Sequence, residues 1–110
     1  MKLHESPFER IMSGKKTIEV RLYDEKRQQI NLGDIIIFLK RPELSEQLYT
    51  EVTGLLKYRT FEELVNDFPM SCFGCPNNYD KEALVEALHE HYTKEEEQKY
   101  GVLGIKLKLL

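Results

Sequence analysis

The sequence predicts a single α+β domain built on a small curled sheet or barrel. The chain of 110 residues is close to the commonest size of one domain, and its six Tyr and five Phe suffice for one hydrophobic core. Segments that alternate like strands lie near both ends and in the middle, and segments with helical spacing lie between them. Strands so distant in the sequence must pair to bury their apolar faces, which is typical of such sheets.

A short helix is expected near the N-terminus. Ser6, Pro7 and Glu9 stand where a helix prefers an N-cap hydroxyl, a proline in the first turn and the acidic partner of a capping box. Gly14 is placed to end the helix in the left-handed conformation, in which glycine has no steric penalty. The helix is therefore predicted to begin after Ser6 and to end before Gly14.

Two strands are expected next. Residues 17–22 alternate between apolar and polar side chains, which predicts a half-buried strand with Glu19 and Arg21 on the face opposite the core. Residues 24–31 are polar and predict a loop. Residues 35–39 are continuously apolar and rich in β-branched side chains, which predicts a strand buried on both faces.

The rest of the chain alternates between strands and helices that begin with a capping residue. The predicted elements are a strand over about residues 48–57, a helix from Thr60 that Pro69 stops, a loop over residues 70–79, a helix from Asp80 to about His91, a short helix from Thr93 to Gly101 and a final strand over residues 102–109. The acidic run of residues 95–97 is expected on the surface of the last of these helices.

Charge is distributed unevenly along the chain. The formal net charge is −3, which argues against a protein that coats nucleic acid through charge alone. Up to Arg41 there are nine basic and six acidic residues, whereas after Arg41 there are seven basic and thirteen acidic residues. The N-terminal third is therefore the expected place for an anionic ligand.

The sequence has no feature of a membrane or secreted protein. No apolar run approaches the roughly 20 residues that span a bilayer, and the first residues contain no apolar signal core. We therefore expect a cytoplasmic protein without a membrane partner.

Two cysteines, Cys72 and Cys75, have the spacing of a metal or redox motif. A zinc site needs two further ligands, and His89 and His91 would point in nearly opposite directions from a helix. A thioredoxin-like pair begins a helix after a strand, whereas this pair precedes Pro76 in a polar loop. We therefore interpret the cysteines as dispensable loop thiols, and expect neither a metal nor a cofactor.

The stretch from Gly14 to Arg21 is the strongest candidate for a functional site. A glycine that ends a helix leads through Lys15 and Lys16 into a strand that presents Glu19 and Arg21 side by side, about 7 Å apart. A carboxylate and a guanidinium held in this way, with lysines beside them, can bind an anion and move a proton. The alternative is a solvated strand face with a weak surface ion pair.

The pattern Gly14-x-Lys16-x-x-Glu19-x-Arg21 resembles the signature of the ASCH domain family, in the PUA-like superfamily of small RNA-related β-barrels. Gly33-Asp34 before an apolar strand and residues 100–105, which lead into the last strand, add to the similarity, which covers residues 1–110 and suggests a small single-domain bacterial type. The resemblance implies a PUA-like pseudobarrel of about five or six strands with three or four short helices, and a cleft lined by the motif.

The resemblance also implies a partner, which is RNA, a nucleotide or a modified nucleoside. Lys15, Lys16 and Arg21 would contact phosphate, Glu19 would accept hydrogen bonds from a base edge, and Tyr23 would complete the ligand-binding set. The alternative is a small hydrolase with Lys16, Glu19 and Arg21 as catalytic residues, of the acetylcytidine amidohydrolase or ribonuclease type found in the family. A third possibility is an interaction domain that keeps the fold without a ligand.

Two departures from the amidohydrolase pattern favour binding over catalysis. Lys16 matches the catalytic lysine of that subgroup, but Glu19 stands in the place of its threonine, and residues 77–80 lack the later glutamate. His4 precedes the first helix, from where it can approach the cleft as a general base, although a surface histidine is the simpler interpretation.

Overall fold

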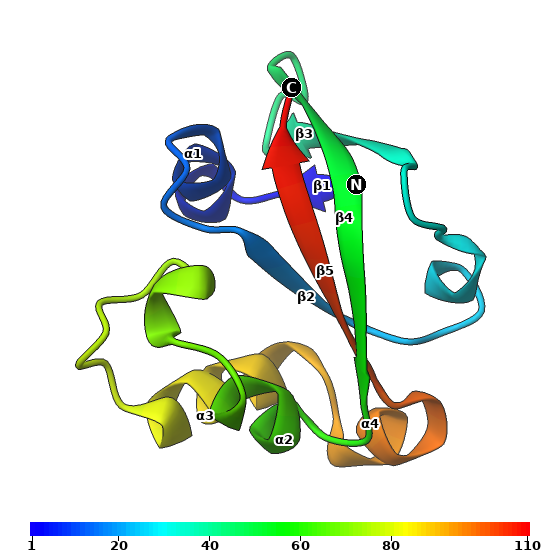
Figure 1. Ribbon diagram of the computed structural model, residues 1–110, viewed down its shortest axis with the longest axis vertical. Helices are drawn as coiled ribbons and strands as arrows, with labels where there is room; N and C mark the ends of the chain where they lie inside the picture. Colours follow the sequence, from blue (N-terminus) through cyan, green and yellow to red (C-terminus); the bar gives the residue numbers. More distant parts are fainter.

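The computed structural model describes all 110 residues as a five-stranded sheet with four α-helices (Figure 1). The elements are β1 (Lys2–Leu3), α1 (Glu5–Met12), β2 (Ile18–Leu22), β3 (Ile35–Lys40), β4 (Gln47–Tyr58), α2 (Phe61–Asn66), α3 (Lys81–His91), α4 (Lys94–Tyr100) and β5 (Val102–Leu109). Two short 3-10 turns, Arg27–Gln29 and Met70–Cys72, lie within segments predicted as loops. The structure confirms the predicted α+β class.

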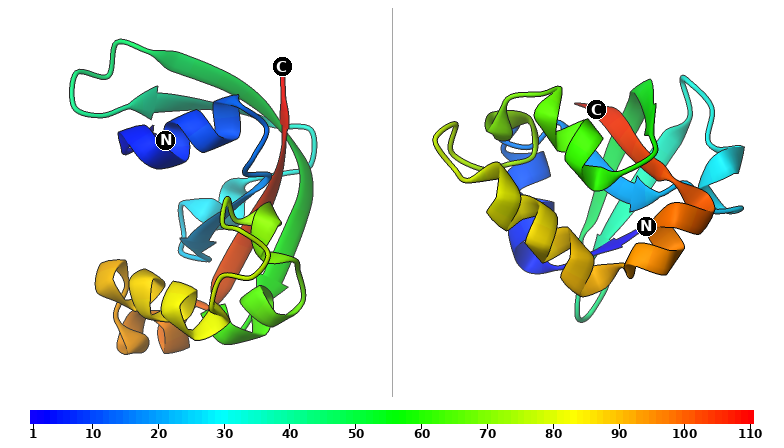
Figure 2. Two further views of the ribbon diagram at one scale, coloured as in Figure 1. Left: turned by 90° about the vertical axis from the view of Figure 1, so that its left-hand side faces the viewer. Right: turned by 90° about the horizontal axis from the view of Figure 1, so that it is seen from below.

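The sheet has the strand order β1-β3-β4-β5-β2, so strands distant in the sequence are neighbours. β2 pairs with β5, β5 with β4 and β4 with β3, all antiparallel, whereas the short β1 runs parallel to β3. The sheet curls, and the helices lie on its concave side, with α1 toward one end and α2, α3 and α4 toward the other (Figure 2). This arrangement is the open pseudobarrel that was expected.

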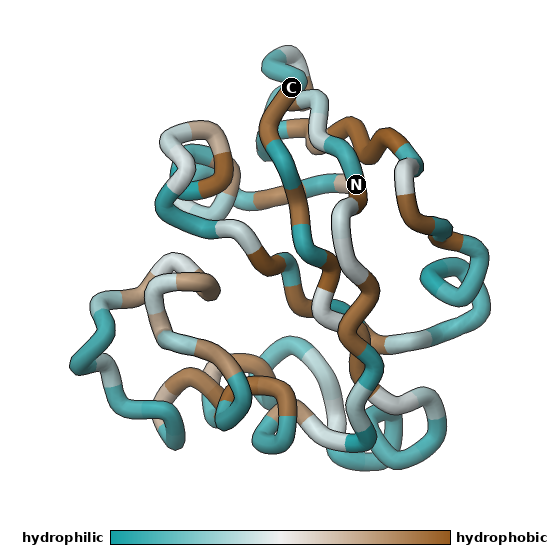
Figure 3. The backbone as a smooth tube through the Cα atoms, in the orientation of Figure 1, coloured by the Kyte–Doolittle hydropathy of each residue, from teal (hydrophilic) through white to brown (hydrophobic).

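The buried side chains form two clusters, one at each end of the curled sheet. The first packs α1 against β3, β4 and β5, and the second joins β2 to α2 and α3. Both clusters use the apolar faces of strands, and the alternation of apolar and polar residues is visible along β5 (Figure 3). At Gly104 a Cβ atom would lie 3.1 Å from Leu64 Cδ1, so the absence of a side chain lets α2 pack closely on β5.

Three helix starts follow the predicted capping rules. The side chains of Thr60, Asp80 and Thr93 accept hydrogen bonds from the backbone amides of Glu63, Glu82 and Glu96, and the full capping box forms at Thr93. The start of α1 does not follow the predicted rule, because the helix begins at Glu5 and Ser6 lies within its first turn. The prediction of Ser6 as an N-cap was wrong: the chain enters the helix from β1, which the sequence analysis did not anticipate.

Two predictions of burial were also wrong. β3 is buried on one face only, since Ile36 and Phe38 are buried while Ile35 and Ile37 are 51% and 39% exposed. Its other face has no covering layer, because all four helices lie on the concave side of the sheet. Glu97, expected on the surface of the last helix, is buried and accepts a hydrogen bond from the backbone amide of Phe61.

None of the helices combines the length and the apolar character that a membrane crossing requires.

Candidate functional site, a basic cavity beside strand β2

Glu19 lies between Lys16 and Arg21 at the centre of the predicted motif. Lys16 Nζ donates a hydrogen bond to Glu19 Oε1 at 2.8 Å, and Arg21 Nε donates to Glu19 Oε2 at 3.0 Å. A second nitrogen of the guanidinium, Arg21 Nη2, lies 2.9 Å from the same oxygen. Both carboxylate oxygens are therefore occupied by charged donors, which form stronger hydrogen bonds than neutral ones.

The local sequence explains this geometry. Ile18 and Leu22 face the core, so the alternation of β2 turns Glu19 and Arg21 to the other face, as predicted. That face is not open to solvent, since the Glu19 side chain is only 6% exposed. Arg21 Nη2 also donates to the carbonyl of Lys2 at 3.3 Å, which fixes the guanidinium against β1. The alternative of a solvated strand face is therefore wrong.

Glu19 is held in its charged form. Burial by itself raises the pKa of Glu19, but the charges and hydrogen bonds of Lys16 and Arg21 outweigh this effect, and the pKa lies below its ordinary value. A carboxylate that stays ionised at neutral pH is a poor general acid. Its physical role in this arrangement is to position two cations.

The three side chains line one cavity of about 380 Å³, enclosed by segments from five parts of the chain. Its lining is made up of Lys2, Leu3, His4, Pro7, Lys16, Glu19, Val20, Arg21, Arg41, Leu88, His91 and Tyr92. Four of these residues are permanently basic and only one is acidic. The cavity is therefore positively charged in a protein whose formal net charge is negative.

One wall of the cavity is less polar. Val20 and Leu88 pack at the margin of the second core cluster, and Tyr92 lies beside them at the end of α3. Burial raises the pKa of the Tyr92 phenol, so its hydroxyl remains protonated and can donate a hydrogen bond. An aromatic ring and two aliphatic side chains beside a group of cations form a surface that suits a planar ring carrying a phosphate.

The predicted site residues fall into two groups. Lys16, Glu19 and Arg21 meet at this cavity, and His4 lines it as well. Lys15 points away and lines two hollows on the other side of the Gly14 turn. Tyr23 packs against the first core cluster, with Lys57 Nζ 4.9 Å from the centre of its ring. Neither Lys15 nor Tyr23 lines the cavity.

Several cavity residues were not found by sequence reasoning. Arg41 reaches the cavity because its backbone amide donates to the carbonyl of Leu3 at 2.7 Å, which brings the end of β3 beside β1. Lys2 belongs to β1, a strand too short to show a pattern. His91 and Tyr92 lie at the C-terminal end of α3, which packs beside the cavity. No spacing rule connects these residues to the motif. The only available signal was the excess of basic residues up to Arg41, which includes Lys2 and Arg41 but says nothing of His91 and Tyr92.

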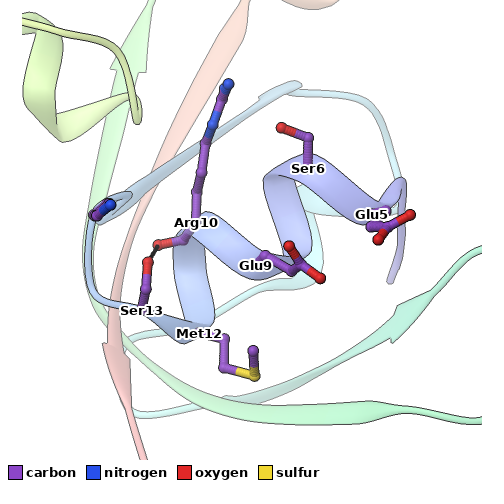
Figure 4. A pocket seen from close by; sticks show the side chains of 7 residues that line it. Glu5, Ser6, Glu9, Arg10, Met12 and Ser13 are labelled. Carbon is purple, nitrogen blue, oxygen red and sulfur yellow. Dashed lines mark hydrogen bonds between the residues drawn. The ribbon is translucent and has the colours of Figure 1, made fainter.

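A larger hollow of about 690 Å³ lies along the outer surface of α1 and has a different character. Its labelled side chains point in diverging directions along the helix rather than toward a common point (Figure 4). Two acidic and two basic residues line it, and Met12 is its only apolar residue. The smaller cavity beside β2 is therefore the better candidate site.

Metal-binding residues do not cluster in this protein. No group of three or more His, Cys, Asp or Glu side chains is placed to hold a metal ion. His89, considered above as a partner for the cysteines, instead lies 3.0 Å from the buried carboxylate of Glu97.

Comparisons with known proteins agree with the fold and identify the family. The ASCH domain family matches residues 1–110. The crystal structure of the hypothetical protein PH0355 is similar over 100% of both chains, with 34% identity and a TM-score of 0.82. The solution NMR structure of protein PF0455 from Pyrococcus furiosus has 31% identity and a TM-score of 0.73, and the match covers 100% of this chain and 98% of that chain. No curated protein matches the sequence.

Proposed function

We propose that this chain, which belongs to the ASCH domain family, binds a nucleotide, either free or as one residue of single-stranded RNA, in the cavity beside β2. The observation that carries the proposal is that four basic residues, Lys2, Lys16, Arg21 and Arg41, line one cavity whose only acidic residue is Glu19. That carboxylate neutralises part of the charge of Lys16 and Arg21 but leaves a net positive cavity. Phosphate is the anion that such a group of lysines and arginines binds best.

The rest of the cavity supports a nucleoside as the remainder of the ligand. Its volume of about 380 Å³ lies within the usual range of small-molecule sites, roughly 300–1,000 Å³. Tyr92 offers a ring on which a base can stack, and the adjacent Val20 and Leu88 offer further apolar contacts. A small ligand also fits the overall charge, because the acidic remainder of the chain would repel a long RNA.

The contacts of Glu19 favour binding over hydrolysis. A hydrolase of the kind considered above needs Glu19 to exchange a proton during each turnover. Here both oxygens accept hydrogen bonds from cations, and the pKa of the carboxyl is lowered rather than raised toward neutrality. The same contacts suit a binding site, in which Glu19 holds Lys16 and Arg21 in place before the ligand arrives.

The test compares two arginines of different location. Arg41 lines the cavity and forms no ion pair, whereas Arg59 is 92% exposed and lies outside it. Affinity for adenosine monophosphate and for a short single-stranded RNA is measured by calorimetry. Arg41→Ala should weaken binding about tenfold, which corresponds to about 1.4 kcal/mol, because one charge-assisted contact is lost. Arg59→Ala should leave the affinity unchanged.

Arg21→Ala extends the same test to the centre of the motif. Its expected loss is about 1.5–3 kcal/mol, because Arg21 is more deeply buried than Arg41 and also positions Glu19. Equal affinities in wild type, Arg41→Ala and Arg21→Ala would contradict the proposal, as would the absence of binding in the wild type. Turnover of acetylated cytidine or RNA that Glu19→Gln abolishes would instead support the hydrolase.

A further inference from the structure

We propose that Cys72 and Cys75 are a redox modification site, which a low-molecular-weight disulfide such as oxidised glutathione converts to an intramolecular disulfide. The closed disulfide weakens ligand binding in the cavity beside β2 through the backbone of Lys16 and Thr17. The proposal of a disulfide depends only on the geometry of the loop, whereas the proposed effect on affinity also rests on the function proposed above.

The two cysteines belong to one compact turn. The amide of Cys75 donates to the carbonyl of Met70 at 3.2 Å, and the amide of Gly74 donates to the carbonyl of Ser71 at 3.1 Å. These two bonds, with Gly74 at a φ of 83°, form a Schellman motif that ends the 3-10 turn Met70–Cys72. The motif folds the chain back on itself, so the two cysteines line the same cavity of about 600 Å³.

Both thiols are within reach of a small reagent. Cys72 and Cys75 carry no disulfide, are half-buried, and lie at the wall of a cavity that also contains Lys15 and Thr17. Neither thiol belongs to a group of three or more His, Cys, Asp or Glu side chains placed to hold a metal ion. With only Phe73 and Gly74 between the cysteines, the loop that a disulfide would close is short.

The turn is joined directly to the motif that forms the candidate site. The carbonyl of Cys72 accepts a hydrogen bond from the amide of Thr17 at 2.9 Å, and Phe73 pairs with Lys16 in an isolated antiparallel bridge. A Cβ atom at Gly74 would lie 3.2 Å from the Cβ of Lys16, so the two backbones are in close contact. The interpretation of the cysteines as dispensable loop thiols did not include this contact, which no local pattern predicts.

The chemistry is an exchange between thiols and a disulfide. One cysteine thiolate attacks the glutathione disulfide, forms a mixed disulfide and releases one glutathione thiol. The second cysteine attacks the mixed disulfide, forms the bond between Cys72 and Cys75, and releases the second glutathione. The protein loses two protons and two electrons in total, and the glutathione disulfide gains them as it becomes two glutathione thiols. In a reducing compartment such bonds form transiently and report a change in redox conditions.

Closing the disulfide changes the position of Lys16. The Cβ atoms of a disulfide lie about 3.8 Å apart, and the proposed switch acts by contracting the turn around Gly74 to this separation. Contraction either breaks the hydrogen bond from Thr17 to Cys72 or draws Thr17 with it, and both outcomes move the backbone that carries Lys16. Lys16 then lies less favourably beside Glu19 and the ligand. An affinity loss of about fivefold is expected, at the low end of the coupling between linked sites.

The experiment titrates the intact protein through glutathione buffers of increasing oxidised fraction and reads the products by mass after alkylation of the remaining thiols. Wild type should lose two hydrogen masses reversibly, without a persistent mixed disulfide. Cys75→Ser and Cys75→Ala should stop at the mixed disulfide or remain unmodified. Wild-type protein that keeps both thiols, or that accumulates only mixed disulfides, overturns the proposal.

Two further measurements test the link to the site. Hydrogen exchange of the Thr17 amide should change when wild type is oxidised, and the affinity for adenosine monophosphate should fall about fivefold. Both values should stay constant in the double variant Cys72→Ser/Cys75→Ser under the same buffers, because it has no thiol to modify. A disulfide that changes neither value overturns the coupling. Absence of nucleotide binding in the reduced protein is a failure of the proposed function only, since the mass and exchange results do not depend on a ligand.

Discussion

Two buried glutamates, Glu19 and Glu97, use the same side chain for different purposes. Glu19 lies at the wall of a cavity, and both of its oxygens accept hydrogen bonds from cations. Glu97 lies between helices: one of its oxygens accepts a hydrogen bond from the backbone amide of Phe61 at 2.7 Å, and the other lies 3.0 Å from Nε2 of His89. Burial is similar at the two sites, so the partners distinguish them.

The comparison shows that the partners of a buried carboxylate determine its role. Glu97 satisfies an amide at the start of α2 and thereby joins α4 to α2 and α3, which is a contribution to stability. Glu19 joins two side chains whose remaining donors face a cavity, so it organises a surface for a ligand. Substitutions at the two positions should separate these roles.

The largest effect on stability is expected at Glu19. Glu19→Gln leaves Lys16 and Arg21 without a counter-charge, and the free energy of unfolding should fall by about 3 kcal/mol. This value is at the low end for breaking a buried ion pair, because both cations keep some contact with solvent. Urea denaturation measures it.

Ligand affinity in the same variant sharpens the comparison. Affinity for adenosine monophosphate should stay level or rise in Glu19→Gln, because the amide keeps the shape and an acceptor oxygen that position the two cations, while the charge that competes with phosphate is lost. A variant that keeps its full stability would show that the ion pairs contribute nothing to the free energy of unfolding, and a loss of nucleotide affinity would contradict the expected competition.

A smaller loss of stability is expected at Glu97. Glu97→Ala leaves the buried amide of Phe61 without an acceptor, which should cost about 1–3 kcal/mol in the free energy of unfolding. Nucleotide affinity should not change, because Glu97 does not line the cavity. The matched control is Glu95→Ala on the exposed surface of the same helix, where a change within about 0.5 kcal/mol is expected. Reduced nucleotide affinity in folded Glu97→Ala would contradict the separation of roles.

The smallest effect is a change in the pH dependence of stability. The pKa of Glu19 is lower in the folded chain than its ordinary value of 4.5, so folding favours the ionised carboxylate. Its contribution is fully present above that ordinary value and is lost as the pH falls through the lower pKa of the folded state. The free energy of unfolding should therefore decrease below about pH 4.5 in wild type, and less steeply in Glu19→Gln. If the free energy of unfolding falls equally steeply below about pH 4.5 in both proteins, Glu19 does not have this role.

The sequence by itself determined the elements whose signals are local. The caps at Thr60, Asp80 and Thr93 depend on residues three positions apart or fewer, and they were predicted correctly. The alternation of β2 likewise determined that Glu19 and Arg21 share one face, since side chains of a strand point to opposite sides in turn.

Only the tertiary structure decided what those faces contact. Alternation places Glu19 opposite the core but does not reveal that β1 and the end of α3 cover that face, bringing Arg41 and His91 to the cavity. The same limit explains the exposed face of β3 and the buried carboxylate of Glu97. In each case the environment is set by residues distant in the sequence. Local patterns encode backbone conformation, whereas burial and charge pairing depend on which segments pack together.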